Sequence, residues 1–141
     1  MAPKSEVHED DLEPSGDPQD QFYTYKGQPF SGICYSTHED GRRSKEVEYV
    51  DGLPNGIWKR WYESGTLKSA STCQSGVKHG SHEEWHDGGP IKLRATYEYG
   101  IQVEVTEWDT AGRMIRAMQL GPDSPGANWS ILMNFRARAK L

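Results

Sequence analysis

The chain has 141 residues, which allows one ordinary domain, and its hydrophobic fraction of 34% is low for a large buried core. Glycine is abundant, at 15 residues, so short strands and many turns are expected in place of long helices. The formal charge is -5, and no apolar run approaches the roughly 18 residues that cross a bilayer, which excludes a transmembrane helix in this sequence.

The N-terminal stretch, residues 1–20, is strongly acidic. It carries seven carboxylates against Lys4 alone, a balance of -6, and three prolines. Its sizeable aliphatic residues are Val7 and Leu12, so it cannot bury enough surface to offset the entropy of ordering. We therefore expect a disordered acidic tail, with an interaction arm as the alternative.

Residues 21–120 contain an internal repeat of about 24 residues. One glycine series has intervals of 24, 24 and 23 residues, a second has 25, 24 and 24, and a third has 24 and 24 before it stops at Val103. The three series are Gly41, Gly65, Gly89 and Gly112, then Gly27, Gly52, Gly76 and Gly100, then Gly32, Gly56 and Gly80. A repeat of this kind changes what every shorter motif within it means.

Side chains keep the same phase as the glycines. Three sets of equivalent positions, called columns here, are defined by their distance from the first glycine series. The first column, four residues before each glycine, is Thr37, Trp61, Trp85 and Trp108. The second, two residues after, is Arg43, Leu67, Ile91 and Met114, and the third, eight residues after, is Tyr49, Cys73, Tyr97 and Leu120. The second and third columns share one strand face, because side chains alternate with a period of 2. We expect this face to be buried and the opposite face, with Lys68 and Arg94, to be solvated.

Each unit predicts a β-hairpin. In the second unit, residues 57–61 are rich in aromatic and β-branched side chains, residues 63–65 have turn chemistry, and residues 66–73 form the return strand. Glycine supplies the positive φ that tight turns require, which explains why it holds the register. The fold class is therefore all-β, with four consecutive antiparallel hairpins at about residues 25–48, 49–73, 74–97 and 98–120.

The last segment, residues 121–141, begins with the helix-breaking cluster GPDSPG at 121–126. Side chains then recur at near-helical spacing: Trp129, Leu132, Met133, Phe135 and Arg136. We expect a short amphipathic helix, or a strand-like segment, that caps the apolar sheet face. Its basic end suits a helix C-terminus. A basic membrane-surface helix is the alternative.

The best-preserved sequence elements are GLPNG at 52–56, IWKRWY at 57–62, SG at 64–65, LK at 67–68 and SGVKHG at 75–80. These elements resemble the MORN-repeat variant (membrane occupation and recognition nexus). The resemblance covers about residues 23–120 and is weaker in the first unit, at Thr37, and in the fourth, at Val103. It implies a curved antiparallel sheet without an active site. Bacterial proteins of this type are often described as antitoxin or immunity-like, and longer eukaryotic arrays as scaffolding or membrane-associated modules.

Metal and thiol chemistry are not expected in this scaffold. His82 and His86 are four residues apart, which on a strand separates them by about 13 Å, too far to share one ion. Cys34 and Cys73 fall three strand spacings apart, roughly 14 Å, beyond disulfide reach. We expect no metal, no cofactor and inert reduced thiols. The lack of a hydrophobic secretory block points to a cytoplasmic location.

The aromatic residues of the second unit are the candidates for binding. Trp58 and Tyr62 flank Arg60 on one strand face, opposite to Trp61, and these three residue types dominate binding hot spots. If the cap covers one sheet face, the other would present them; packing against neighbouring hairpins is an equal alternative. The predicted binding residues are Trp58, Arg60, Tyr62, Glu84 and His86.

These features together predict a non-enzymatic module that binds a protein partner. Carboxylate pairs such as Glu83 and Glu84 point to opposite faces, so no acid–base site is expected. In the narrower version the protein is an antitoxin or immunity protein that covers a toxin, with the acidic arm in a basic groove. The alternative is a membrane-associated or scaffolding module that binds anionic lipid through the C-terminal segment or assembles a complex. Nucleic acid is not expected, because residues 21–141 are near neutral. The oligomeric state is open.

Overall fold

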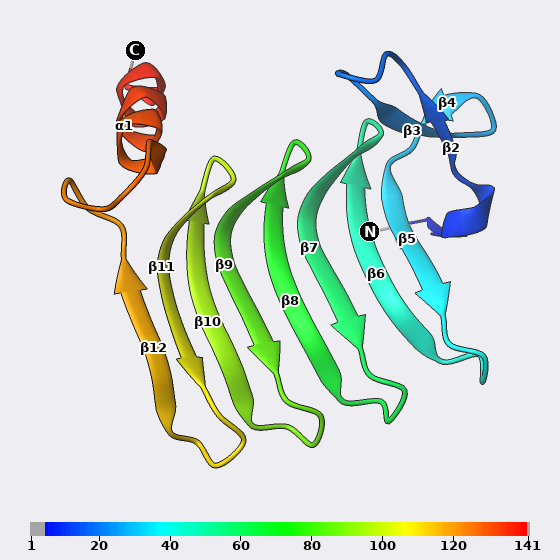
Figure 1. Ribbon diagram of the computed structural model, residues 1–141. Helices are drawn as coiled ribbons and strands as arrows, with labels where there is room; N and C mark the ends of the chain where they lie inside the picture. Colours follow the sequence, from blue (N-terminus) through cyan, green and yellow to red (C-terminus); the bar gives the residue numbers. More distant parts are fainter. Residues whose placement is uncertain (1–4, 141) are drawn as a thin grey trace.

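The structure is a computed structural model that describes residues 5–140. Nine strands form one open sheet in the order β1-β5-β6-β7-β8-β9-β10-β11-β12, and three more form a small sheet in the order β2-β3-β4 (Figure 1). Strands β1 to β12 span Glu6–His8, Glu13–Ser15, Phe22–Tyr25, Gln28–Pro29, Gly32–Thr37, Arg43–Val50, Leu53–Trp61, Leu67–Gln74, Val77–Trp85, Ile91–Glu98, Ile101–Trp108 and Met114–Gln119. A short 3-10 helix, η1, spans Glu9–Asp11, and one helix, α1, spans Asn128–Ala139.

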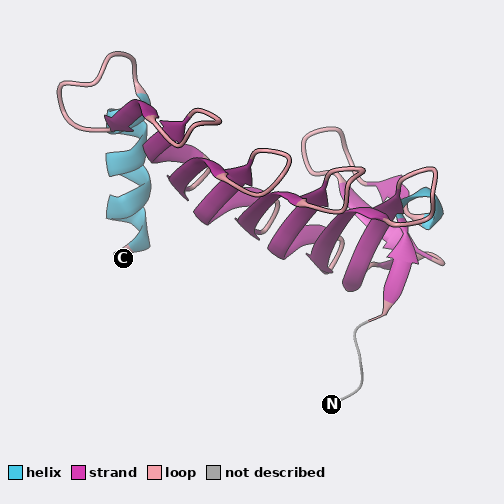
Figure 2. Ribbon diagram, turned by 90° about the horizontal axis from the view of Figure 1, so that it is seen from below, coloured by secondary structure: helices cyan, strands magenta, loops and turns pink. Residues whose placement is uncertain are grey.

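The predicted fold class is confirmed. From β5 to β12 each strand pairs antiparallel with the next, which makes four consecutive hairpins. The first hairpin begins at Gly32, later than the expected start near residue 25, because β3 and β4 belong to the small sheet. Seen along its strands, the main sheet is a single layer, with α1 at one end and the N-terminal segment at the other (Figure 2).

The turns between hairpins explain the second glycine series. Gly52 and Gly76 both have φ of +86°, and the residues before them, Asp51 and Ser75, have φ of 50° and 49°. Two successive positive φ values define a type I′ turn, whose twist matches that of the strands it joins. The glycine spacing is therefore the spacing of the turns.

One face of the main sheet carries a buried row of side chains, and we call it the inner face. Residues that pair directly across strands point to the same side. The row runs across all nine strands through Val7, Cys34, Val47, Trp58, Ser71, His82, Ala95, Val105 and Met118. It is apolar at both ends and polar in the middle. Only its last member, Met118, is exposed.

The expectation about the two faces holds for Cys73 and Tyr97 but is wrong for the second column, Leu67, Ile91 and Met114. A bulge in each return strand pairs these three residues with Trp61, Trp85 and Trp108, which lie on the face opposite to the inner one. Cys73 and Ala95 on the return strands are 4% exposed and lie on the inner face. The inner face is open at β12, where Met118 is 46% exposed, because β12 is the last strand. The opposite face carries polar pairs such as Arg94 and Glu83, which are 3.2 Å apart.

The prediction of a disordered tail is wrong for residues 5–20. Strand β1 pairs parallel with β5, and β2 pairs with β3. Val7 is 7% exposed and packs in a cluster with Phe30 and Cys34, against which Leu12 also packs. Val7 and Leu12 are sufficient because residues outside the segment, chiefly Phe30 and Cys34, supply the rest of this cluster. Residues 1–4 of the expected tail lie outside the described residues.

The C-terminal helix forms as predicted but does not lie on the apolar sheet face. It lies beyond the ends of β10 to β12 (Figure 1), against the turn between β10 and β11. Phe135 stacks on Tyr99 with ring centroids 4.9 Å apart, and Arg136 donates hydrogen bonds of 2.9 and 2.5 Å to Glu98. Those hydrogen bonds lower the pKa of Glu98. In the described part of the chain, no helix has the length and apolar character to cross a membrane.

Both cysteines are free and buried, as expected. Burial raises the pKa of the Cys34 thiol to about 11 from its ordinary value of 9.0.

A thiol that holds its proton more tightly when folded stabilises the fold below pH 9, and this contribution is lost between about pH 9 and 11. We expect the unfolding free energy of Cys34→Ala to fall less steeply with pH than that of the wild type across that window. The two slopes should differ by about 1.4 kcal/mol per pH unit. Urea titrations of both proteins at several pH values measure this, and parallel curves would contradict it.

Candidate functional site

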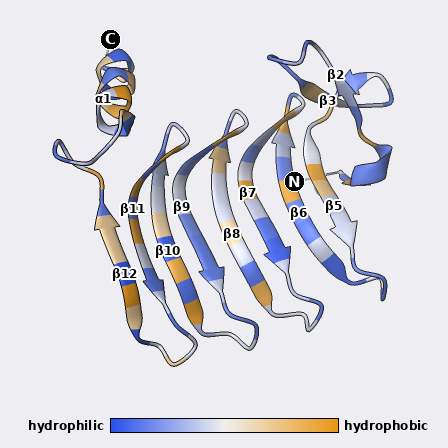
Figure 3. Ribbon diagram, in the orientation of Figure 1, coloured by the Kyte–Doolittle hydropathy of each residue, from blue (hydrophilic) through white to orange (hydrophobic). Residues whose placement is uncertain are grey.

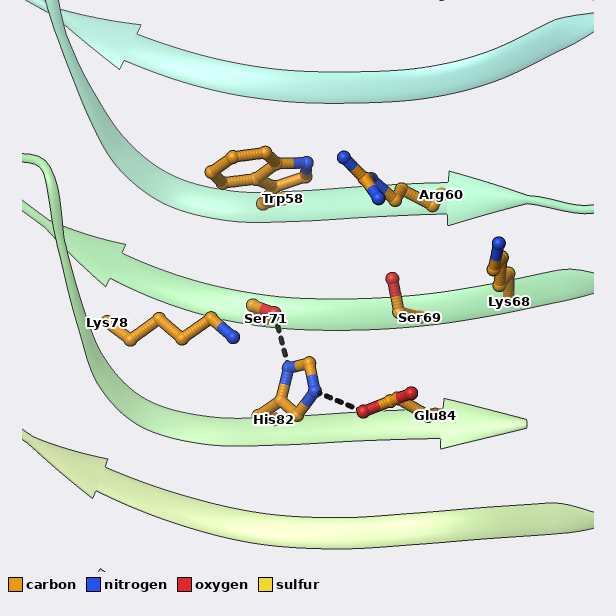
Figure 4. Close-up of a pocket in the computed structure, with 8 residues that line it drawn as sticks. All are labelled: Trp58, Arg60, Lys68, Ser69, Ser71, Lys78, His82 and Glu84. Atoms are coloured by element: carbon orange, nitrogen blue, oxygen red, sulfur yellow. Dashed lines mark hydrogen bonds and ion pairs between the residues drawn. The ribbon is translucent and has the colours of Figure 1, made fainter. Parts of the chain in front are cut away.

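An open pocket of about 300 Å³ lies in the middle of the inner face, across β7, β8 and β9 (Figure 4). Eight residues line it: Trp58 and Arg60 from β7, Lys68, Ser69 and Ser71 from β8, and Lys78, His82 and Glu84 from β9. Three of the predicted binding residues, Trp58, Arg60 and Glu84, are therefore brought together here.

The floor of the pocket is a chain of hydrogen bonds from Ser71 through His82 to Glu84. Ser71 Oγ lies 2.5 Å from His82 Nδ1, and His82 Nε2 lies 2.9 Å from Glu84 Oε2 (Figure 4). Because a carboxylate only accepts, Nε2 carries a proton, and in the neutral imidazole Nδ1 then accepts from the serine hydroxyl. Ser71 is 7% and His82 8% exposed. These hydrogen bonds thus satisfy the buried polar groups of Ser71 and His82.

The order serine, histidine, carboxylate also occurs in acyl-transfer enzymes, where further donors stabilise the developing oxyanion. Here Ser71 is almost completely buried, in the middle of β8, and pairs with Trp58 on one side and His82 on the other. We therefore assign these hydrogen bonds a structural role, which is to hold the side chains of His82 and Glu84 in place.

Three cations surround this floor. Figure 4 shows Lys78 at one end of the pocket and Arg60 and Lys68 at the other. Each lies near an aromatic ring: Arg60 is 5.9 Å from the Trp58 centroid, and the two lysines are 5.4 Å from that of Tyr62 and 5.0 Å from that of Tyr97. Within residues 5–140, none of the three forms an ion pair. Glu84 is the one carboxylate in the lining, so the pocket has a net charge of +2 with His82 neutral.

The cations of the neighbouring hairpin are neutralised by the N-terminal segment. Lys45 pairs across strands with Arg60, and its Nζ lies 2.5 Å from Glu9. Arg43 lies 2.9 Å from Glu6. The hydrogen bond from Lys45 is the main cause of the lowered pKa of Glu9. Two of the acidic residues predicted to reach a partner, Glu6 and Glu9, thus form ion pairs within the chain.

The other two predicted residues, Tyr62 and His86, lie outside the pocket lining. The Tyr62 hydroxyl donates to the carbonyl of Trp85 at 2.7 Å, and His86 Nε2 lies 3.0 Å from the carbonyl of Trp108. His38 makes the same contact with the carbonyl of Trp61, also at 3.0 Å. We call these three contacts the turn ties. They recur every 24 residues and link the turn of one hairpin to the next strand pair, a role that the repeat spacing could have indicated.

The sequence did not single out Lys68, Ser71, Lys78 and His82 as parts of one site. Lys68 was expected on the solvated face, but it lines the pocket next to the register shift between Arg60 and Trp61 in the β7–β8 pairing. His82 was considered only as a zinc ligand with His86. In the part of the chain that the structure describes, no group of three or more histidine, cysteine or carboxylate side chains is placed to hold a metal ion.

The fold and the pocket together define an open, single-layer repeat sheet with a basic, aromatic-walled depression at its centre. Comparison with protein-family models found no match, and searches of curated proteins and of solved structures found none either. The resemblance to the MORN-repeat variant stays a prediction from the sequence pattern.

Proposed function

We propose that the protein is a non-enzymatic binding module whose inner face holds an acidic segment of a partner protein across β7 to β9. The observation that carries this proposal is the set of three pocket cations, Arg60, Lys68 and Lys78, which form no ion pair within the described residues. In the neighbouring hairpin, by contrast, Arg43 and Lys45 are paired with carboxylates.

The contact between Lys45 and Glu9 supports the same mode of binding. An acidic stretch of the chain already lies against the neighbouring hairpin, with its carboxylate 2.5 Å from Lys45. Arg60 is the cross-strand neighbour of Lys45 on the next strand, and within residues 5–140 it has no such ion pair, although Glu9 lines a shallow pocket beside it. Hydrogen bonds between ionised partners are about twice as strong as neutral ones, so a carboxylate-rich segment suits these positions.

The pocket walls favour a protein segment as the ligand. Trp58 supplies an apolar surface, and its indole Nε1 is buried without a hydrogen-bond partner among the described residues. Ser69 adds a hydroxyl. Rings that lie beside the cations restrict their side chains before binding, which lowers the entropy lost on association.

The narrower function, neutralisation of a toxin, rests on the MORN resemblance and stays a prediction. In the binding mode proposed above it would require an acidic patch on the toxin, because the pocket carries three cations against Glu84 alone. The cytoplasmic location likewise stays a prediction.

Lipid binding through the C-terminal helix is less well supported. Leu132 is 1% exposed, and Phe135 and Arg136 are engaged with Tyr99 and Glu98, so these side chains of α1 face the protein. Anionic vesicles are nevertheless included in the test, since acidic head groups carry the same charge as an acidic peptide.

The test uses a fluorescein-labelled oligoglutamate peptide and fluorescence anisotropy. We expect Arg60→Ala with Lys78→Ala to weaken binding about tenfold or more, because two charge-assisted contacts are lost, and wild-type affinity to fall with salt. The control is Lys59→Ala with Arg94→Ala, which removes the same charge from the opposite face. Equal losses in both variants would refute the proposal. Binding of phosphatidylserine vesicles that only the pocket variant abolishes, without peptide binding, would reassign the site to lipid.

A further inference from the structure

A second hollow of the inner face adjoins the pocket. It has a volume of about 360 Å³, and Arg60 and Lys68 line both hollows. Its far wall includes Ser36 on β5, Lys45 on β6 and Glu9 in η1. The pocket cations are thus continuous with a position where a cation and a carboxylate already meet.

The carboxylate in the second hollow belongs to the acidic N-terminal segment. Figure 3 shows the short coil of η1 in blue, at the hydrophilic end of the scale, and Figure 1 shows it beside β5. Glu9 Oε2 lies 2.5 Å from Lys45 Nζ, a charge-assisted contact. Because Lys45 is the cross-strand neighbour of Arg60, the Cβ atoms of these two cationic residues are about 5 Å apart.

Ser36 supplies a second polar group at this position. It is 9% exposed, and within residues 5–140 its Oγ is buried without a hydrogen bond of ordinary geometry. The hydroxyl is nevertheless close enough to Glu9 to help lower the pKa of that carboxyl, after the larger effect of Lys45. Buried hydroxyl groups normally have a partner, so Ser36 is placed to donate to a carboxylate held at Lys45.

We propose that Lys45 and Ser36 form a second anion subsite of the inner face, which Glu9 occupies until a carboxylate of the acidic partner replaces it. This inference rests on the proposed function, because it takes the ligand to be acidic. Glu9 is then an internal competitor that restricts the ligand to the three pocket cations, and its release extends the binding surface from β7 to β6.

The exchange requires only a side chain to move. The Glu9 side chain is 41% exposed, and ion pairs of such exposed groups contribute little to stability. The segment itself stays anchored, because β1 pairs with β5 and Val7 is 7% exposed. Glu9 can therefore leave Lys45 while the N-terminal segment remains in place.

A double-mutant cycle tests the subsite with the fluorescein-labelled oligoglutamate peptide. We expect Glu9→Gln to raise the affinity about fivefold, because Lys45 then becomes free for a charge-assisted contact with the ligand. Adding Lys45→Ala should return the affinity to within about twofold of the wild type, because the subsite is removed and the net charge is restored. Circular dichroism spectra of both variants should match that of the wild type.

Asp10→Asn is the matched control. Asp10 is the next residue and carries the same charge, but its side chain is 84% exposed and lies 3.4 Å from His8. Its removal should change the affinity less than about twofold, because an exposed charge is screened by salt. Equal gains in Glu9→Gln and Asp10→Asn would reveal a general effect of charge and overturn the subsite.

The same measurements separate the two proposals. If the wild type binds the peptide and Glu9→Gln binds it equally well, the subsite is refuted and the proposed function stands. If only Glu9→Gln binds, the subsite is supported and the pocket of the wild type is not sufficient for binding. If neither protein binds, both proposals are refuted.

Discussion

Replacing Leu132 by alanine is expected to detach α1 from the sheet. Leu132 is 1% exposed and is the one residue of α1 that is fully buried. Truncation of a buried leucine to alanine costs about 2–5 kcal/mol, through the lost transfer energy and the cavity left behind. The remaining contacts, the Phe135–Tyr99 stack and the Arg136–Glu98 pair, are partly exposed and contribute less.

A detached α1 should also unfold, because a helix of 12 residues is marginal in water on its own. Hydrogen exchange of the amides in residues 128–139 and trypsin cleavage after Arg136 or Arg138 should both become faster. The control is Ile131→Ala, the neighbouring residue, which is 42% exposed and should cost under about 1 kcal/mol. If both variants retain wild-type exchange rates, docking does not depend on Leu132.

Replacing Gly52 by alanine is expected to disrupt the contact between the small sheet and the turn that joins β6 to β7. Gly52 has a φ of +86°, and an added Cβ would lie 2.8 Å from the Tyr23 carbonyl oxygen and 2.9 Å from Phe22. The approach is fixed by two backbone hydrogen bonds of 2.8 Å, from Tyr23 to Gly52 and from Gly52 to Phe30. The methyl group therefore meets backbone that cannot move without breaking these bonds.

Gly41→Ala is the matched control. Gly41 has nearly the same φ, +88°, but an added Cβ would meet nothing within 4 Å. It should cost only the backbone strain, about 1–2 kcal/mol, whereas Gly52→Ala should cost about 1–3 kcal/mol more through overpacking. Unfolding free energies from denaturant titrations measure both. Equal losses would show that the small sheet does not constrain Gly52.

The repeat and the hairpins could be predicted because they depend on local chemistry. A type I′ turn requires positive φ at two successive residues, and glycine at 52 and 76 meets that need whatever the rest of the chain does. The position of α1 could not be predicted in this way. It depends on the stacking of Phe135 on Tyr99, two residues far apart in the chain, and on one buried leucine.

The N-terminal segment shows a second limit. Its composition correctly indicates that residues 1–20 cannot form a core alone, but Val7 is buried in a core built mainly by Phe30 and Cys34. Composition describes what a segment can bury within itself. It does not show that another part of the chain offers an uncovered strand edge, such as that of β5, with which the segment can pair.

The site was predicted in part for a similar reason. Trp58, Arg60 and Glu84 line the pocket, and alternation along one strand is enough to place the first two on one face. The contribution of Lys68 and Lys78 depends on how neighbouring strands pair. The register shifts between Arg60 and Trp61 and between Ser71 and Cys73 lie beside them, and such shifts have no clear signal in one sequence.

The turn ties have a consequence for how a chain of this kind can change in length. Each tie runs from His38, Tyr62 or His86 to the carbonyl of a tryptophan in the next unit, so the three joints share the same kind of contact. Insertion or loss of one 24-residue unit would leave the joints on either side intact. Evolution could thus lengthen or shorten the sheet in steps of two strands, and each step would alter the spacing between the pocket and the β12 edge without rebuilding either.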